Sequence, residues 1–212
     1  MATTKELYYE KRGKILVQNL LNRHFDACYC ANKKEALDKA LEWIPEGASV
    51  GWGGTASAAQ IGLQDAIRNG NYVAYDRENC KTVHEKEQCE KDSMFADFFL
   101  TGANAVSLDG QMVNIDGTGN RVAAIIYGPK NVLVVVGMNK VCDTLDDAMK
   151  RARTVASPMN MQRFDKDTPC AKTGVCGDCK KEGCICNQIV ITRHCRPVGR
   201  IKFLVVGEDL GY

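Results

Sequence analysis

Five of the eleven cysteines in this 212-residue chain lie close together near its C-terminal end. The segment reads CAKTGVCGDCKKEGCIC from Cys170 to Cys186. Three of the thiols have the spacing Cys-x5-Cys-x2-Cys, and the glycines between them allow the backbone angles that let sulfur atoms converge. Four thiolates suit either a tetrahedral zinc ion or an iron–sulfur cluster. We therefore predict a metal centre, with an iron–sulfur cluster preferred over Zn²⁺, whose ligands are Cys170, Cys176, Cys179 and Cys186.

The other cysteines leave alternatives open. Cys184 is a substitute fourth ligand, and Cys195, next to His194, is a further candidate. We expect Cys28 and Cys30 to point to opposite faces of a strand and not to bind a metal together. A purely structural metal, which holds a loop without a core of its own against the domain, is equally compatible with this pattern.

Charge and composition exclude several classes of function. The chain has 28 Lys and Arg against 26 Asp and Glu, and a net charge of +2 does not indicate a nucleic-acid partner. The first residues, MATTKELYYEKRGK, lack the apolar core of a signal peptide. The longest apolar run, Val132 to Val136, is far shorter than the ~18–20 residues that span a bilayer. We expect a cytoplasmic protein with no membrane span, in which thiols favour metal or redox chemistry over disulfides.

Apolar periodicity predicts helices and strands in alternation. Strands are predicted over 25–30, 48–52, 72–75, 98–100, 131–137, 189–192 and 201–206, and helices over 5–23, 33–44, 55–68, 83–93, 121–127 and 145–156. Asp109-Gly110, between apolar runs, predicts a β-hairpin over 105–115. This order predicts one α/β domain over residues 1–212, with a mainly parallel sheet covered by helices, a β-hairpin insertion and a Cys-rich loop over 169–187.

A glycine-rich turn, GWGGTAS over 51–57, follows one of these strands and opens a helix. Backbone N–H groups at such a turn can bind a phosphate or a carboxylate. The same glycines are also compatible with nothing more than a tight turn and close packing. The turn lacks the lysine of a P-loop and the full dinucleotide fingerprint, so it indicates an anion site without naming a nucleotide.

Polar residues also gather at turns and strand ends over 99–140. Asn104, Asn114, Asp116, Asn120 and Arg121 lie between apolar strands. Open α/β sheets bind their ligands at such strand ends. Together with GWGGTAS, the pattern PCAKTGVCGDC and the ending GRIKFLVVGEDLGY, this segment closely resembles the LUD-domain family, the lactate-utilization proteins. The resemblance extends over nearly the whole chain, and NIDGTGNR is its most distinctive part.

The resemblance implies a fold like those of ribose-5-phosphate isomerase, glucosamine-6-phosphate deaminase and the coenzyme A transferases. In such folds a small anionic ligand lies at the Gly-rich turns over the sheet edge. In this sequence, Asp116 would be the acid–base group and Arg121 the two-point partner of a carboxylate or phosphate. The remaining pocket residues implied are Gly53, Gly54, Thr55, Asn104, Gly119, Asn120 and Lys140. Turn capping is the competing role for Asp116 and Asn120.

Two departures limit what the resemblance implies. Many relatives have acidic residues after the Gly-rich turn, where this chain has Ser57-Ala58-Ala59-Gln60. A glutamate nucleophile motif like that of the coenzyme A transferases is also missing from the sequence. The family implies a component of 2-hydroxy-acid (lactate) oxidation, acting with partner subunits of an iron–sulfur oxidoreductase. The alternative is a stand-alone enzyme or sensor that binds a small phosphorylated or carboxylated ligand and uses its metal only structurally.

Overall fold

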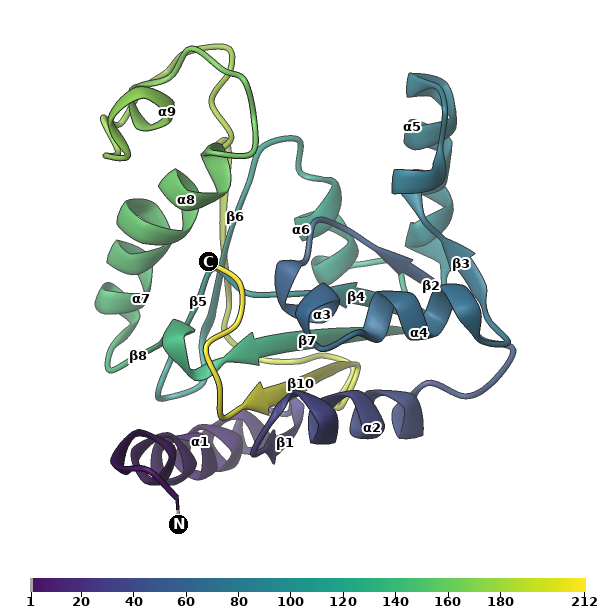
Figure 1. Cartoon of the computed structure of the whole chain (residues 1–212), viewed down its shortest axis with the longest axis vertical. Helices are drawn as coiled ribbons and strands as arrows, with labels where there is room; N and C mark the ends of the chain where they lie inside the picture. Colours follow the sequence, from purple (N-terminus) through teal and green to yellow (C-terminus); the bar gives the residue numbers. More distant parts are fainter. Residues whose placement is uncertain (1) are drawn as a thin grey trace.

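A computed structural model describes residues 2–212, which form two β-sheets with helices around them (Figure 1). The strands of the larger sheet are β1 (Asp26–Cys30), β2 (Ser49–Trp52), β3 (Val73–Tyr75), β4 (Phe98–Thr101), β7 (Asn131–Gly137) and β10 (Ile201–Val206). They lie in the order β1-β10-β7-β4-β2-β3, and every neighbouring pair is parallel. The predicted α/β fold with a mainly parallel sheet is confirmed.

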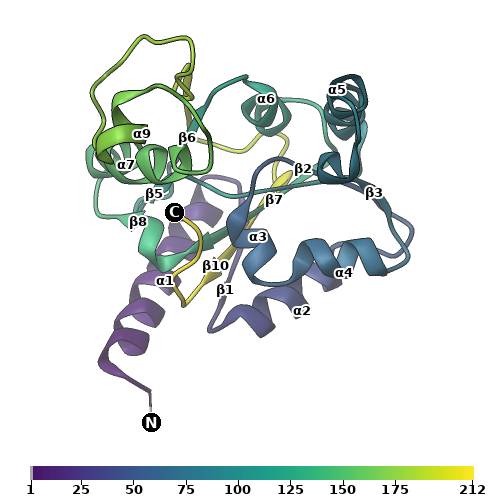
Figure 2. The ribbon, with the colours of Figure 1, turned by 45° about the horizontal axis from the view of Figure 1, so that its top comes forward.

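Helices cover both faces of this sheet (Figures 1 and 2). One face packs against α2 (Lys33–Trp43), α3 (Ala56–Gln60) and α4 (Leu63–Asn69), and the other against α1 (Thr4–Asn22) and α6 (Asn120–Ile126). A further helix, α5 (Val83–Asp92), packs beside β2 and β3. No helix within residues 2–212 has the length and apolar character needed to cross a membrane.

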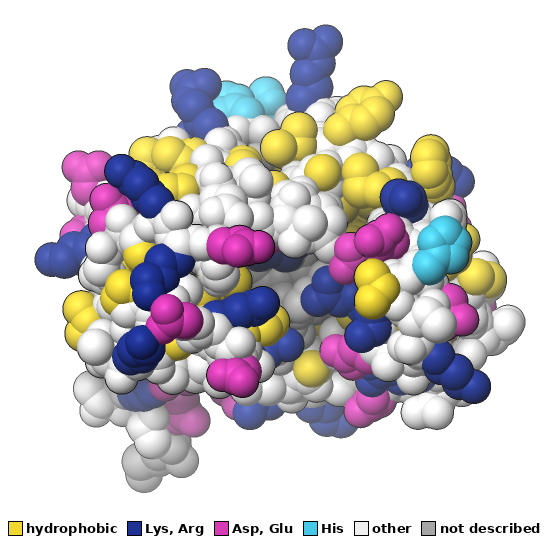
Figure 3. Space-filling view, turned by 90° about the horizontal axis from the view of Figure 1, so that it is seen from above, with side chains coloured by type: hydrophobic (Ala, Val, Ile, Leu, Met, Phe, Trp, Pro, Cys, Tyr) yellow, Lys and Arg dark blue, Asp and Glu magenta, His cyan; other side chains and the backbone are white. Residues whose placement is uncertain are grey.

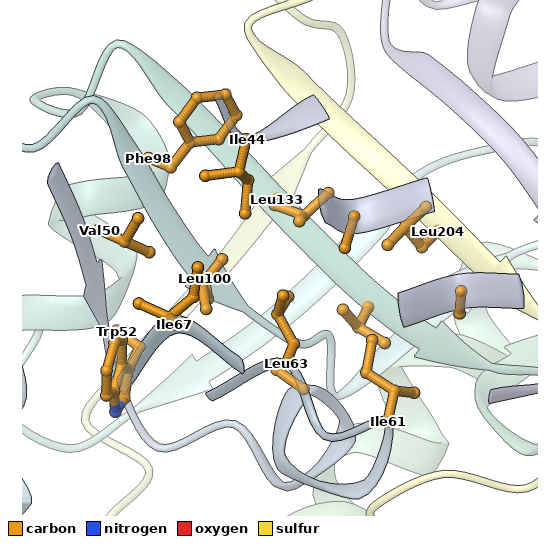
Figure 4. Close-up of a cluster of buried hydrophobic side chains, with 14 of the residues drawn as sticks. Ile44, Val50, Trp52, Ile61, Leu63, Ile67, Phe98, Leu100, Leu133 and Leu204 are labelled. Atoms are coloured by element: carbon orange, nitrogen blue, oxygen red, sulfur yellow. The ribbon is translucent and has the colours of Figure 1, made fainter. Parts of the chain in front are cut away.

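On the face covered by α2, α3 and α4, buried apolar side chains of the helices pack against those of β2, β4, β7 and β10 (Figure 4). Leu100 of β4, Leu133 of β7 and Leu63 of α4 are fully buried in it. Burying a leucine side chain contributes roughly 1.5–3 kcal/mol. On the opposite face, Val132 and Val134 of β7 pack with α1, because successive side chains of a strand point to opposite faces. The uninterrupted apolar run of β7 follows from this coverage on both sides.

The smaller sheet contains the predicted hairpin. Its strands, in the order β8-β5-β6-β9, are β5 (Ala105–Ser107), β6 (Met112–Asp116), β8 (Val141–Cys142) and β9 (Gln188–Thr192). β5 and β6 are antiparallel and flank the turn at Asp109-Gly110, where Gly110 has a φ of +90°. β9, predicted as a strand over 189–192, pairs antiparallel with β6 and does not join the larger sheet. The chain that leaves the cysteine-rich loop is therefore fixed to the strand that ends in Asp116.

Two predicted helices differ from those in the structure. The helix expected over 55–68 is divided into α3 and α4, because Gly62 adopts a left-handed conformation with a φ of +79°. The helix expected over 145–156 continues to residue 161, through α7 (Leu145–Arg151), a π-helical segment η4 (Ala152–Ala156) and α8 (Ser157–Met161). π-Helical segments often lie beside functional sites. Here the extension carries Ala156 and Asn160 to the strand ends described below.

Strand order places a crevice between β2 and β4. The chain leaves β2 toward β3 on one side, whereas it leaves β4 toward β7 on the other. Such a switch point, where neighbouring strands send their connections in opposite directions, opens a crevice at the carboxyl ends of the strands. Gly53 follows β2 and Gly102 follows β4, so both glycines lie at this crevice.

Candidate functional site

A cavity of about 330 Å³ occupies the crevice at the strand ends. Its lining includes residues of α8, the cysteine-rich loop, α3 and α6. In Figure 1, α8 lies to the left of α3 and α6. Of the nine pocket residues implied by the family resemblance, all but Gly119 line this cavity: Gly53, Gly54, Thr55, Asn104, Asp116, Asn120, Arg121 and Lys140. Gly119 lies just outside, with a φ of +94°, at the N-terminus of α6. The structure therefore brings residues from four separate segments to one place.

The lining of the cavity is strongly cationic. Its basic residues are Arg77, Arg121, Lys140, Arg163 and Lys166, whereas Asp116 is its acidic residue. Figure 3 shows Lys and Arg side chains around a hollow on this face of the molecule. A Cβ atom placed on Gly54 would lie 3.5 Å from the Arg77 guanidinium and 3.6 Å from that of Arg163. The Gly-rich turn thus passes between two arginines, which attract an anion to the turn.

Arg121, predicted to bind the anion, is committed to contacts within the protein. Its Nη1 donates to the carbonyl oxygen of Gly102 at 3.3 Å and to Oδ1 of Asn114 at 2.9 Å. Its Nη2 donates to Oδ1 of Asn104 at 3.1 Å and to the carbonyl oxygen of Ile115 at 2.6 Å. The guanidinium therefore joins the end of β4 to β6 and holds the pocket floor in place.

Asp116 caps the turn that follows β6. Its Oδ1 accepts from the backbone N–H of Gly117 at 2.8 Å, and its Oδ2 accepts from that of Val122 at 3.1 Å. The same Oδ2 lies 3.6 Å from Nε of Arg121. Burial lowers the pKa of Arg121, and the Asp116 carboxylate opposes this effect. Both carboxylate oxygens of Asp116 thus accept backbone hydrogen bonds, as the capping role considered from the sequence requires.

Lys140 is the most unusual ionisable group in the cavity. It ends the short 3-10 helix η3 (Met138–Lys140) that follows β7, and only 5% of its surface is exposed. Its Nζ donates to Oγ of Ser57 at 3.1 Å. Burial, and to a smaller extent the positive charges of Arg151 and Arg121, lower its pKa to about 7. A lysine with such a pKa is a weak point charge and a good nucleophile or base near neutral pH.

The sequence model of the LUD domain matches residues 14–206. This chain belongs to the LUD-domain family. Its fold is similar to that of a DUF162 family protein from Deinococcus radiodurans, with a TM-score of 0.53 and 11% identity over 93% of this chain and 97% of that one. A D-ribose-5-phosphate isomerase in complex with phospho-erythronic acid gives a TM-score of 0.35 and 20% identity, over 53% of this chain and 54% of that one. Ribose 5-phosphate isomerase A from Neisseria gonorrhoeae gives 0.34 and 17% over the same shares. No protein of curated function matches the sequence.

Several pocket residues of this LUD domain were missed by sequence reasoning. Asn160 lies in α8, and Arg163 and Lys166 lie in the chain after it. Arg77 follows β3, and Ser57 ends the GWGGTAS segment as the second residue of α3. Ser57 lay in the segment where acidic residues were sought, and its hydroxyl contacts Lys140 instead. The strand-end position of Arg77 was a usable signal, because strand ends gather ligand-binding side chains. No comparable signal in the sequence indicated that α8 extends to the pocket.

The cysteine-rich loop lies beside this pocket, and Ile185 of the loop lines it. Within residues 2–212, no three Cys, His, Asp or Glu side chains converge as a metal site. The predicted ligand Cys170 lies 3.5 Å from Oγ1 of Thr168. Cys184, considered only as a substitute, is more central: its Sγ accepts from the backbone N–H of Cys186 at 3.4 Å. Burial raises the pKa of Cys184, and its hydrogen bond with Cys179 adds to the increase.

Outside the loop, Cys28, Cys30 and Cys195 pack in the hydrophobic core of this LUD domain. The prediction that Cys28 and Cys30 point to opposite faces is wrong, because residues two apart in a strand share a face. Their sulfur atoms lie 3.8 Å apart under α2. Cys195 is 2% exposed, accepts from the backbone N–H of Ile201 and donates to the carbonyl oxygen of Pro197. Its partners are thus backbone groups of its own turn.

Proposed function

We propose that this lactate-utilization-type protein binds a small carboxylate or phosphate in the crevice between β2 and β4, as a component of 2-hydroxy-acid oxidation. The observation that carries the proposal is the charge of the cavity, which has five basic residues and a single acidic one in its lining. The position at a switch point of the parallel sheet supports it, since such crevices are where α/β proteins bind ligands.

The proposal divides the pocket residues by their remaining hydrogen-bonding capacity. Arg121 and Asp116 hold the floor, because their polar atoms are used by the protein itself. Arg163 and Arg77 flank the Gly-rich turn and bind the anionic group of the ligand with the donors that their contacts with Asn160 and Glu90 leave over. Lys140, which is buried, faces the part of the ligand that distinguishes one small acid from another.

Ligand-induced stabilisation tests this function. Lactate, pyruvate and inorganic phosphate are titrated against the protein, and the rise in Tm is followed for each ligand. Arg163→Ala removes a pocket cation and should reduce the rise, because binding stabilises the folded state in proportion to affinity. Arg153→Ala is the matched control, since Arg153 pairs with Asp178 outside the pocket lining. Equal Tm rises in both variants would contradict an anion site at this crevice.

We further propose a second site, in which the cysteine-rich loop binds an iron–sulfur cluster, with Zn²⁺ as the alternative. The density of half-buried thiols over residues 170–186 favours it. Cys184, with its neighbours Cys179 and Cys186, is the natural centre of the ligand set, to which Cys176 or Cys170 adds a sulfur. A cluster would supply one-electron transfer to oxidoreductase partner subunits, whereas zinc would hold the loop.

Metal analysis after anaerobic purification separates these uses. Iron with equivalent sulfide and visible absorption supports electron transfer, and stoichiometric zinc without iron or sulfide contradicts it. Cys184→Ser and Cys170→Ser form a matched pair within the loop. The first should release the metal, whereas the second should retain it if Cys170 serves only its contact with Thr168.

A further inference from the structure

Among residues 2–212, Lys140 forms no salt bridge, and the cavity that it lines is rich in cations. Its ammonium group donates to the neutral hydroxyl of Ser57, a residue of α3 that is 1% exposed. Every influence on its pKa acts to lower it: burial first, then Arg151 of α7 and Arg121 of α6. A site that needed only positive charge would favour an arginine here, because arginine stays protonated when buried.

The surroundings of Lys140 hold the amine rigidly in one place. The carbonyl oxygens of Asn139 and Asn104 accept from Arg151, which fixes the second cation next to the lysine. A Cβ atom on Gly211 would lie 2.9 Å from Nζ, so the segment over 207–212 closes the space on another side. Ser57 Oγ, at 3.1 Å, orients the remaining lone pair of the amine and can exchange a proton with it.

We propose that Lys140 forms an imine with the carbonyl carbon of a 2-oxo carboxylate held in this pocket, an inference that rests on the anion-binding function proposed above. The neutral amine attacks the carbonyl carbon, and the electron pair of the C=O bond moves to the oxygen. Nitrogen gives up two protons to that oxygen, the C–O bond breaks, and water leaves as the C=N bond forms. Nothing is oxidised or reduced in this step, so it needs no further co-reactant.

The ligand class follows from combining the two halves of the cavity. The arginines beside the Gly-rich turn require an anionic group, and the deprotonated lysine requires an electrophilic carbon. A 2-oxo acid carries both on adjacent atoms. A 2-hydroxy acid carries the same anion without the electrophile, so it binds in the pocket and does not react with the amine.

Reductive trapping tests the inference on the unaltered protein. Pyruvate or glyoxylate is added with cyanoborohydride, and the modified lysines are located by peptide mapping. Lys140 should carry at least about ten times more reduced adduct at pH 7 than the exposed Lys130, because burial lowers the pKa of Lys140 to about 7 and leaves a large share of its amine unprotonated. Its trapping rate should rise from pH 6 to pH 8 and then level off.

The outcomes distinguish this inference from the function on which it rests. Lactate should compete with pyruvate for trapping and form no adduct itself, and Lys140→Arg should lose the adduct. If lactate raises Tm but Lys140 is trapped no more than Lys130, the imine is wrong and the anion site stands. If neither lactate nor pyruvate raises Tm and no adduct forms at Lys140, both are wrong.

Discussion

At the floor of the pocket, one guanidinium donates to four oxygen atoms, whereas the cysteine-rich loop over 169–187 consists of a five-residue helix and surface turns. Polar groups of the floor depend on one another, because the guanidinium of Arg121 supplies donors to the side-chain oxygens of Asn104 and Asn114. The loop buries little apolar surface, and Cys186 is its main contact with the core of the smaller sheet. The floor is therefore fixed by the hydrogen bonds of the fold itself, whereas the loop joins the core of the smaller sheet mainly at Cys186.

Removing Arg121 should break the floor and have the largest effect. Arg121→Leu leaves the buried oxygen of Asn114 without its donor, takes one of two donors from Oδ1 of Asn104 and leaves Asp116 without its ion pair. We expect the free energy of unfolding to fall by roughly 3–5 kcal/mol, measured by urea denaturation. Arg153→Leu, which removes an exposed pair with Asp178, should change it by less than about 0.5 kcal/mol. Similar losses in the two variants would contradict the distinction.

Glycine substitutions compare the close packing of the two regions. A Cβ atom on Gly137, at the end of β7, would lie 2.5 Å from the backbone nitrogen of Leu210 and 2.6 Å from Oδ1 of Asn139. Gly137→Ala should therefore cost about 1–3 kcal/mol in thermal or urea unfolding. In the loop, a Cβ atom on Gly183 would lie 3.4 Å from the flexible Lys166 side chain. Gly183→Ala should be tolerated within about 0.5 kcal/mol, and an equal loss there would show that the loop is as tightly packed as the end of β7.

Lys140→Met should stabilise the protein by roughly 2 kcal/mol at pH 7, since it removes a buried charge that lacks a carboxylate partner and loses one hydrogen bond. The pKa of Lys140 is about 7 in the folded protein, against 10.5 ordinarily. Between these values the unfolded chain binds the additional proton, so wild-type stability gains from rising pH. The advantage of the variant should shrink from pH 7 to pH 9 in paired urea titrations. An advantage that grows with pH would contradict the shifted pKa.

Cysteine substitutions should have the smallest effect on the metal-free protein. Cys176→Ser in chelator-treated protein should alter the free energy of unfolding by less than about 0.5 kcal/mol, because the loop buries little. Cys195→Ala, in the core, should cost about 1–2 kcal/mol through its lost hydrogen bonds with Ile201 and Pro197. In metal-loaded protein, Cys176→Ser should lower the stability more than Cys195→Ala does. Calorimetry with and without chelator can detect this reversal. A large loss for Cys176→Ser without metal would place the loop in the folded core.

Local sequence signals predicted the elements well where one rule was sufficient. The β-branched run of β7 and the Asp109-Gly110 turn were correctly assigned. The break at Gly62 was missed, because a glycine within an apolar periodic run is compatible with a continuous helix until its conformation is known. The partner of β9 was also missed, since its pairing with β6 is set by tertiary contacts and not by its own residues.

The candidate site was predictable as a place and not as a set of roles. Polar residues at strand ends identified the crevice, because parallel strands bring their carboxyl ends together. The acceptors of the Arg121 hydrogen bonds depend on the distance between β4 and β6, and no spacing in the sequence encodes that distance. The pKa of Lys140 likewise depends on burial and on the way α7 packs Arg151 against it.

The position of β10 has a consequence for how the chain acquires its fold. This strand inserts between β1 and β7, so its residues 201–206 separate two strands that were synthesised much earlier. Until Val206 has left the ribosome, β1 has no neighbour and one side of β7 stays open. Unpaired strand edges of this kind are prone to association during folding. The larger sheet, and the pocket at its strand ends, can therefore be completed only after β10, which follows all the other strands of this sheet in the sequence.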